Sequence, residues 1–209
     1  MRTPLPDPFR PAAEGIAPDR ILQLLLDGNL RYATGRSAAP RRNPIRRQHI
    51  AEEQHPLAVV VACSDSRVPP EIILDQGLGD LFIVRLAGNV VGNTGLGSIE
   101  YAATHLGARC ILVMGHYNCG AIQAAIAGGP TESHVSSIME ALAPAVEEAR
   151  GQEGDLVENA VRANVRRVCA QLRESEPVLR PLVDEGRVQV YGVVYDLRSG
   201  RLTPLDGVP

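Results

Sequence analysis

Short runs of consecutive apolar residues recur along the chain, and segments with helical spacing separate them. The clearest runs are residues 57–63 (LAVVVAC) and 109–114 (RCILVM), which are typical of strands buried on both faces. Further strands are predicted over residues 80–86 and 187–195, the latter followed by a hairpin-like turn at 198–200. Because strands and helices alternate, the pattern predicts an α/β fold with a mainly parallel central sheet flanked by helices.

The first helix is predicted over residues 18–34, with Asp19 as its cap and Gly35 as its end. A connector rich in Pro and Arg follows over residues 36–56, with one short helix near 48–53. The other helices are expected over residues 69–74, over 98–106 after a glycine-rich turn at 88–97, over 121–127, and over most of 131–180. We therefore predict an N-terminal helical arm and connector over residues 1–56 and an α/β domain over 57–209, forming one domain overall.

Composition narrows the functional classes. Hydrophobic residues make up 44% of the 209 residues, but the chain has only two Phe and no Trp, so its core must be aliphatic. The net charge of −3 provides no field for holding nucleic acid. We see no secretory signal and no stretch that approaches a membrane span, so we expect a cytoplasmic protein without a membrane partner. Four cysteines in such a chain indicate metal ligation or buried thiols rather than a disulfide framework.

Three potential metal ligands follow the two most apolar strands. Cys63 ends the first strand, and His116 and Cys119 come shortly after the strand over 109–114. If these strands are neighbours, the three side chains converge at the carboxyl edge of the sheet. Thiolate and imidazole ligands favour zinc, and three ligands leave the fourth position open, as in catalytic sites. Cys110 and Cys169 are expected to be buried thiols.

Asp65 and Arg67 lie two and four residues after Cys63. One interpretation is a helix start, with Ser64 or Asp65 as the cap. The other is an ion pair beside the metal, in which Arg67 holds the carboxylate away from the zinc by a bidentate contact. The two interpretations are compatible.

Alternatives to a zinc enzyme are weaker or remain open. The loop over residues 88–97 follows a strand and opens a helix, as a phosphate-binding loop would, but it lacks the dinucleotide fingerprint and no Gly-Lys-Ser/Thr follows. A zinc deaminase would need His-x-Glu and Pro-Cys-x-x-Cys elements, which are absent. A non-catalytic zinc protein, in which Asp65 permanently caps the metal, stays open.

The two motifs resemble those of a known family. The sequence CSDSR over residues 63–67, followed by HYNC over 116–119, is similar to the β-class carbonic anhydrases, and the likeness covers nearly the whole chain. The resemblance implies one Zn²⁺ per chain, held by Cys63, His116 and Cys119, with Asp65 and Arg67 as a catalytic dyad. It implies reversible hydration of CO2 to bicarbonate and a proton, by attack of zinc-bound hydroxide. It also implies that Asp65 becomes a fourth ligand in a closed state of some members.

The resemblance further implies a substrate pocket and an assembly. Gln54 matches a glutamine that binds bicarbonate, and Phe82 and Tyr101 match aromatic residues that line the CO2 pocket. Gly120 stands where the family places a backbone N–H near the bound anion. Members are dimers or larger homo-oligomers with the active site at the subunit interface, and the N-terminal helix reaches across to the partner. Some relatives hydrolyse carbon disulfide or carbonyl sulfide with the same ligands, so these substrates remain alternatives.

One residue departs from part of the family. Members with a second, regulatory bicarbonate site carry a Trp three residues before the first ligand cysteine. Here that residue is Val60, and the chain contains no Trp. The sequence therefore predicts that no regulatory bicarbonate site exists next to Val60.

Overall fold

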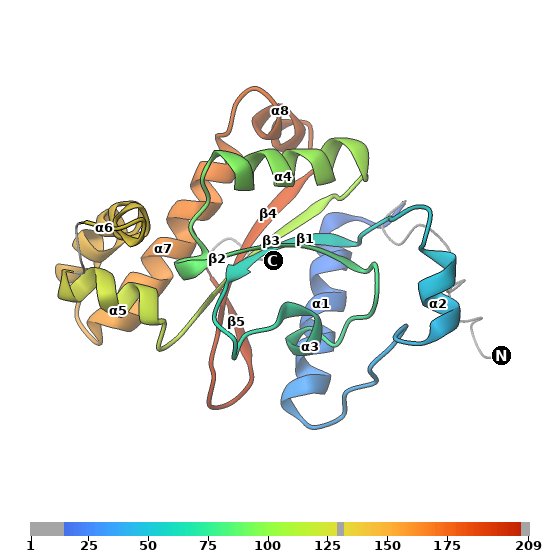
Figure 1. The fold of residues 1–209 in the computed structure, drawn as a ribbon, viewed down its shortest axis with the longest axis horizontal. Helices are drawn as coiled ribbons and strands as arrows, with labels where there is room; N and C mark the ends of the chain where they lie inside the picture. Colours follow the sequence, from blue (N-terminus) through green and yellow to red (C-terminus); the bar gives the residue numbers. More distant parts are fainter. Residues whose placement is uncertain (1–14, 129–131, 206–209) are drawn as a thin grey trace.

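A five-stranded sheet forms the centre of the computed structural model, which describes residues 15–128 and 132–205 (Figure 1). The strand order is β2-β1-β3-β4-β5, and the first four strands in this order run parallel, whereas β5 runs antiparallel to β4. The strands are β1 (Ala58–Cys63), β2 (Leu81–Leu86), β3 (Cys110–His116), β4 (Gln189–Tyr195) and β5 (Leu202–Pro204). The predicted α/β fold with a mainly parallel sheet is confirmed.

The strands in the middle of the sheet are buried along their whole length. Every residue of β1 and of β3 is buried, in agreement with their continuous apolar sequences. β2 lies at the edge of the sheet and is more exposed. The core is therefore a mainly aliphatic layer around β1, β3 and β4, as the scarcity of aromatic residues predicted, with Tyr191 and Tyr195 of β4 as buried aromatic members.

Helices cover both faces of the sheet. On β4, the Tyr191 hydroxyl contacts the Asp19 carboxylate of α1 (Pro18–Ala33), whereas the next residue, Gly192, faces Val165 of α7 (Leu156–Arg173). Because successive strand residues point to opposite faces, α1 and α7 lie on opposite sides of the sheet. A Cβ on Gly192 would come within 2.9 Å of the Val165 side chain, so glycine lets α7 approach the sheet closely.

The remaining helices are shorter or lie further out. In Figure 1, α5 and α6 pack beside α7 at one side of the molecule, and α2 lies at the other side. They are α2 (Pro44–His49), α3 (Pro70–Ile73), the 3-10 turn η1 (Ala87–Asn89), α4 (Asn93–His105), α5 (Gly120–Ala127), α6 (Val135–Arg150) and α8 (Leu179–Asp184). No helix in the described ranges is long and apolar enough to span a bilayer.

Three details of the helix predictions are wrong. α2 begins at Pro44 and ends at His49, ahead of the predicted range, because Asn43 accepts a hydrogen bond from the Arg46 N–H and caps it. α4 begins at Asn93, inside the predicted glycine-rich turn. Asp19 does not cap α1, since it lies in the first turn and contacts Tyr191 instead. Residues 1–14 of the predicted arm, and residue 131, lie outside the described residues.

Two buried aspartates attach the connector to the rest of the fold. The Asp75 carboxylate is fully buried and accepts hydrogen bonds from Arg31 Nε at 2.7 Å and from the Ala38 and Ala39 N–H groups. The Asp80 carboxylate forms an ion pair with Arg41 at 2.6 Å. The basic connector is therefore bound to internal carboxylates, which agrees with a structural rather than a nucleic-acid-binding role for these arginines.

Candidate metal centre

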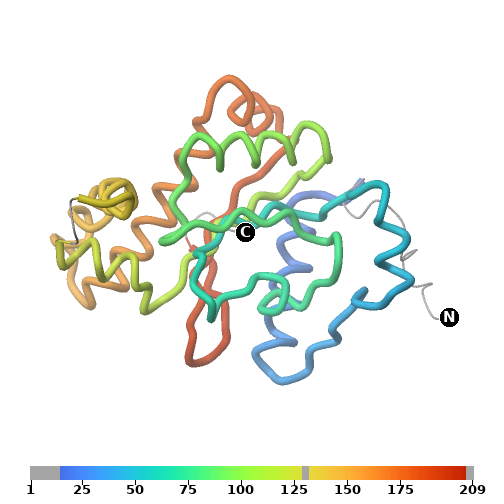
Figure 2. The backbone as a smooth tube through the Cα atoms, viewed as in Figure 1, coloured from blue at the N-terminus to red at the C-terminus, as the bar shows by residue number. Residues whose placement is uncertain are grey.

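The three predicted ligands meet at the carboxyl ends of two adjacent strands. β1 and β3 pair directly, with Ala62 opposite Met114, and Figure 2 shows the chain leaving both strands at the same end of the sheet. Cys63 and His116 are the last residues of these strands, and Cys119 immediately precedes α5. The two Sγ atoms and a His116 ring nitrogen all lie within 4.8 Å of one another, and all three residues are buried.

The His116 ring is oriented so that one nitrogen faces the two sulfurs. Its Nδ1 lies 3.0 Å from the Tyr117 carbonyl oxygen, which fixes this nitrogen as the hydrogen-bond donor. Its Nε2 is buried and has no hydrogen-bond partner among the described residues. A buried imidazole nitrogen without a partner is costly unless something binds its lone pair. Two cysteine sulfurs and an imidazole nitrogen are donors that suit zinc, so these three residues would hold a Zn²⁺ ion.

Backbone N–H groups surround the two sulfurs. The Gly88 N–H donates to Cys63 Sγ at 3.2 Å, and the N–H groups of Ile122 and Ala121, in the first turn of α5, point to Cys119. The hydrogen bond from the Cys119 thiol, more than any other contact, lowers the pKa of Cys63, and the same bond raises the pKa of Cys119. The two sulfurs are thus in hydrogen-bonding contact, and the surrounding N–H groups favour negative charge on them.

Asp65 and Arg67 form the predicted ion pair next to the cluster. Arg67 Nη2 lies 2.7 Å from Asp65 Oδ2, and the same group reaches the Asn118 carbonyl oxygen at 3.2 Å. Hydrogen bonds from the Arg67 side chain are the main reason that the pKa of Asp65 is lowered to about 2. Asp65 Oδ2 lies 3.9 Å from His116 Nε2, so the carboxylate borders the position where a metal fits.

The helix-cap interpretation of this segment is wrong. The cap position of α3 is Pro69, which offers no side-chain acceptor. Asp65 instead accepts a hydrogen bond from the Arg67 N–H at 2.9 Å. The segment is thus a turn that presents the ion pair to the site.

Arg85 was not predicted to take part. From β2 its Nε donates to the Cys63 carbonyl oxygen at 2.9 Å, and its Nη2 donates to the Asp65 carbonyl oxygen at 2.6 Å. It holds the backbone of the turn that carries one metal ligand and the acidic residue. No local sequence signal identifies it, because the contact depends on the β1–β2 register, in which Ala62 lies opposite Arg85.

The predicted substrate-pocket residues divide between two places. Gly120 is the first residue of α5, directly after Cys119, at the metal end of the sheet. Phe82 pairs with Val59 near the start of β1, and its ring lies 6.5 Å from that of Tyr101. Val59 and Cys63 are four strand steps apart at about 3.3 Å per step, so the Phe82 backbone lies about 13 Å along the strand from the metal end. Gln54 is exposed in the loop before β1, also at the start of the strand.

The two other cysteines behave as predicted. Cys110, in β3, and Cys169, in α7, are buried thiols, and burial raises their pKa to about 12 and about 11, respectively. The suggested phosphate-binding loop has a different role, since the Gly88 N–H is already bound to Cys63. These observations favour one metal centre with two of the four cysteines.

Comparisons with known proteins agree with this geometry. Residues 58–202 match the family described as carbonic anhydrase. Carbonic anhydrase 2 of Mycobacterium tuberculosis is 38% identical over 188 residues, covering 88% of this chain and 91% of the relative. The structure of the β-carbonic anhydrase CcaA has a TM-score of 0.71 at 27% identity, covering 90% of this chain and 96% of that one. A tetrameric β-carbonic anhydrase of Sordaria macrospora has a TM-score of 0.68 at 26% identity, covering 90% and 98%. The chain therefore belongs to the β-carbonic anhydrase family, whose activity is the zinc-dependent, reversible hydration of CO2 to bicarbonate and a proton.

Proposed function

We propose that Cys63, His116 and Cys119 hold the catalytic zinc of this enzyme, one ion per chain. The observation that carries this assignment is the buried His116 Nε2, which faces two sulfurs and has no other partner in the described part of the chain. Its ring is held by the Tyr117 carbonyl oxygen, an arrangement common for metal-binding histidines. Three protein ligands leave a fourth position for water or substrate.

Asp65 and Arg67 act beside that fourth position. When bound, zinc supplies a Lewis acid that lowers the pKa of a coordinated water to about 7. The Asp65 carboxylate is an acceptor that can orient this water, because Arg67 keeps it ionised and turned to one side. Arg67 also binds the Asn118 carbonyl oxygen, so it connects the two loops that carry the ligands.

Gly120 is suited to orient the anionic product. It is the first residue of α5, where the backbone N–H groups have no partner within the helix and the helix dipole favours negative charge. The space beside its Cα is open, since a Cβ there would meet nothing within 4 Å. Bicarbonate formed at the metal would thus find a donor one residue from Cys119.

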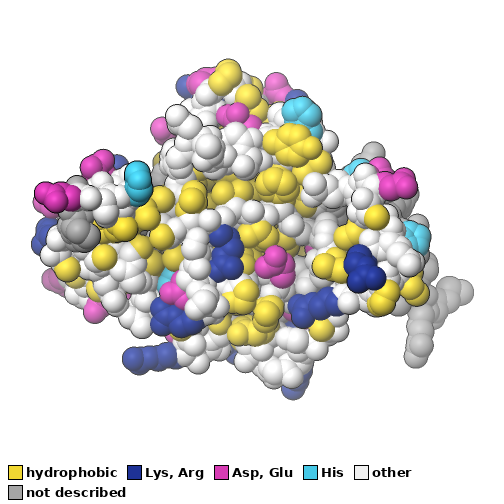
Figure 3. Space-filling model, in the orientation of Figure 1, with side chains coloured by type: hydrophobic (Ala, Val, Ile, Leu, Met, Phe, Trp, Pro, Cys, Tyr) yellow, Lys and Arg dark blue, Asp and Glu magenta, His cyan; other side chains and the backbone are white. Residues whose placement is uncertain are grey.

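The substrate pocket requires a second copy of the chain. Gln54, Phe82 and Tyr101 lie at the end of the sheet opposite to their own metal ligands, so they would line the pocket of a partner subunit. Tyr101 is 48% exposed and Leu86, at the end of β2, is 37% exposed. Apolar side chains extend across the middle of the face drawn in Figure 3, where β2 and α4 lie in Figure 1. The tetrameric relatives from Sordaria macrospora support a homo-oligomer.

Metal content and stopped-flow CO2 hydration, measured on the same zinc-loaded samples, test the assignment. Cys63→Ser, His116→Ala and Cys119→Ser should each lose zinc and activity. Cys110→Ser is the matched control, because it makes the same change in a buried cysteine of β3 that is not a ligand. Full zinc retention in any two of the three ligand variants would refute the assignment. Parallel assays with carbonyl sulfide and carbon disulfide determine whether these substrates are also used.

We propose a cytoplasmic location. All four cysteines are free, and two of them are deeply buried thiols away from the metal centre. Free thiols are typical of a reducing compartment. Fractionation of the producing cells, followed by detection of the chain, tests this directly.

A further inference from the structure

Two hydrogen bonds that meet at Gly88 form a path from α7 to the Cys63 sulfur. Asn164 Nδ2 donates to the Gly88 carbonyl oxygen at 2.8 Å, and the Gly88 N–H donates to Cys63 Sγ at 3.2 Å. Both bonds are buried, and Asn164 is only 3% exposed. The path joins three segments that lie far apart in the sequence.

The Gly88 N–H differs from the other donors around the sulfurs. The backbone N–H of Asp65 donates to Cys63 from two residues away. The backbone N–H groups of Ala121 and Ile122 donate to Cys119 from the helix that follows it. These donors are fixed by their own local backbone. Gly88 comes from the turn after β2 and has φ = 66°, so its peptide groups depend on other contacts for their direction.

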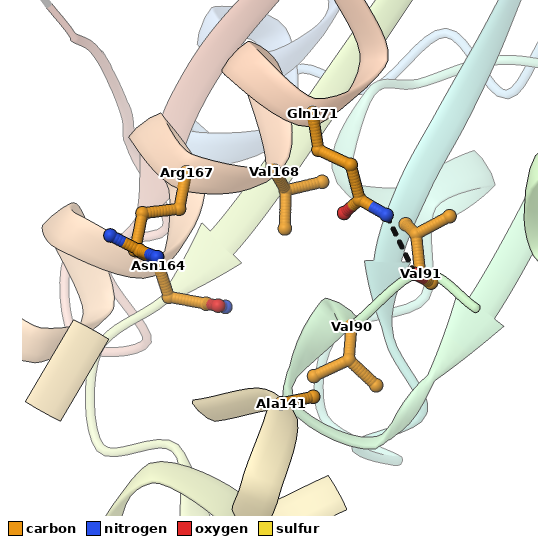
Figure 4. Close-up of a pocket in the computed structure, with 7 residues that line it drawn as sticks. All are labelled: Val90, Val91, Ala141, Asn164, Arg167, Val168 and Gln171. Carbon is orange, nitrogen blue, oxygen red and sulfur yellow. Dashed lines mark hydrogen bonds between the residues drawn. The ribbon is translucent and has the colours of Figure 1, made fainter. Parts of the chain in front are cut away.

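Asn164 provides such a contact from a wall of a cavity. A cavity of about 360 Å³ lies between α7 and the turn after β2, and Figure 4 shows Asn164 and Gln171 extending from α7 toward it. Gln171 Nε2 donates to the Val91 carbonyl oxygen at 3.0 Å. The two amides thus make the same kind of bond to the same turn, but only Asn164 binds the residue whose N–H reaches the sulfur.

We propose that Asn164 is a positioning residue for the metal centre, acting on Cys63 through the backbone conformation of Gly88. The Gly88 carbonyl oxygen and the Gly88 N–H belong to successive peptide groups, so by holding the carbonyl oxygen Asn164 restricts the backbone angles of Gly88 and keeps the N–H directed at the sulfur. The hydrogen bond from this N–H in turn draws electron density from the thiolate. Outer contacts of this kind tune the ligands that they orient. The inference rests on the proposed role of Cys63 as a ligand and adds a residue that does not touch the metal.

Cobalt substitution of the full chain tests the proposal, because the thiolate-to-cobalt charge-transfer band reports directly on the sulfurs. Asn164→Asp keeps the shape of the side chain but removes the donor to Gly88. We expect the band to move to longer wavelength, since a thiolate that loses a hydrogen bond gives up electrons more easily. Zinc affinity, measured by competition with a chromophoric chelator, should fall about tenfold. Asn164→Ala, which adds no charge, should move the band in the same direction.

Gln171→Glu is the matched control, since it removes the equivalent donor to Val91 on the same helix. It should leave the band and the zinc affinity unchanged. An unchanged band in both Asn164 variants, or the same shift in Gln171→Glu, would overturn the proposal. If cobalt-loaded Cys63→Ser has the same charge-transfer band as the cobalt-loaded wild type, the ligand assignment is refuted, and this inference with it.

Discussion

Arg67 binds Asp65 through two parallel hydrogen bonds, from Nε to Oδ1 at 2.9 Å and from Nη2 to Oδ2 at 2.7 Å. A bidentate pair of this kind fixes the carboxylate in direction as well as in charge. Arg67, whose side chain is half exposed to solvent, therefore sets the position of the Asp65 carboxylate from within the same turn.

The first prediction concerns this pair. Asp65→Asn should lower CO2 hydration by about a hundredfold, because the amide cannot accept as a carboxylate does. Arg67→Ala should also lower turnover, and it should move the acidic limb of the pH–rate profile to higher pH, since the released carboxylate can occupy the fourth metal position. In the wild type, hydrogen bonds from Arg67 lower the pKa of Asp65 and so favour its ionised form. Zinc content should be unchanged in both variants, and wild-type turnover in both would contradict the dyad role.

The second prediction concerns the shared pocket. A chain with Cys63→Ser lacks a metal ligand but keeps both aromatic rings, whereas a chain with Phe82→Ala and Tyr101→Ala keeps the ligands and lacks the rings. Each variant alone should be poorly active. After mixing and subunit exchange, a heterodimer has one complete site, so activity should rise. No gain in samples shown to contain heterodimers would place the rings in the pocket of their own chain or outside it.

The third prediction concerns the buried Asp75. Asp75→Asn suits the local backbone, since asparagine tolerates the φ of 49°, but it breaks the ion pair with Arg31. We expect a loss of about 3 kcal/mol in the free energy of unfolding at neutral pH. Asp27→Asn is the control, because Asp27 lies on α1 together with Arg31 and its carboxylate accepts a hydrogen bond from the exposed Gln23. It should cost less than about 0.5 kcal/mol.

The same substitution has a pH signature. Burial would raise the pKa of Asp75, but hydrogen bonds from Ala38, Arg31 and Ala39 outweigh it and lower the pKa. A lowered folded-state pKa means that the stabilisation is complete above the unfolded pKa and is lost as the pH falls through the folded value. Urea unfolding of wild type and Asp75→Asn should therefore converge on acidification, and a gap that widens at low pH would contradict this account.

The fourth prediction concerns Val60. Its side chain is fully buried in the middle of β1, between Ile83 of β2 and Leu112 of β3. An anion placed there without a partner would cost several kcal/mol. Bicarbonate should thus act only as ordinary product, and the pH–rate profile should keep its shape as bicarbonate is added. A steeper, cooperative loss of initial rate with added bicarbonate would show this prediction to be wrong.

Much of the centre could be predicted because its signals are local. The continuous apolar runs that end at Cys63 and near His116 identify two buried strands, and the carboxyl edge of a parallel sheet is where such residues meet. The ion pair of Asp65 and Arg67 spans only two residues. Each of these predictions needed the order of elements and the chemistry of the side chains, but no exact distance.

Three of the errors and omissions have a different cause. Asp19 looks like a cap, but the Tyr191 hydroxyl, 172 residues away along the chain, takes its carboxylate. Arg85 and Asn164 contact the ligand segments only after the β1–β2 register and the packing of α7 are set. Neither residue has a local pattern that distinguishes it from an ordinary strand arginine or helix asparagine. Tertiary contacts of this kind outweigh local conformational preference, and the periodicity of the sequence does not reveal them.

The opposite placement of the metal ligands and the aromatic pair has a consequence for how much protein must be present. If each pocket takes its rings from a second copy, a lone chain has both the metal ligands and the rings but cannot bring them together in one pocket. Dilution below the dissociation constant would then switch the enzyme off without unfolding it or removing zinc. Specific activity would fall with dilution and return on concentration, so the supply of chain itself would regulate the rate.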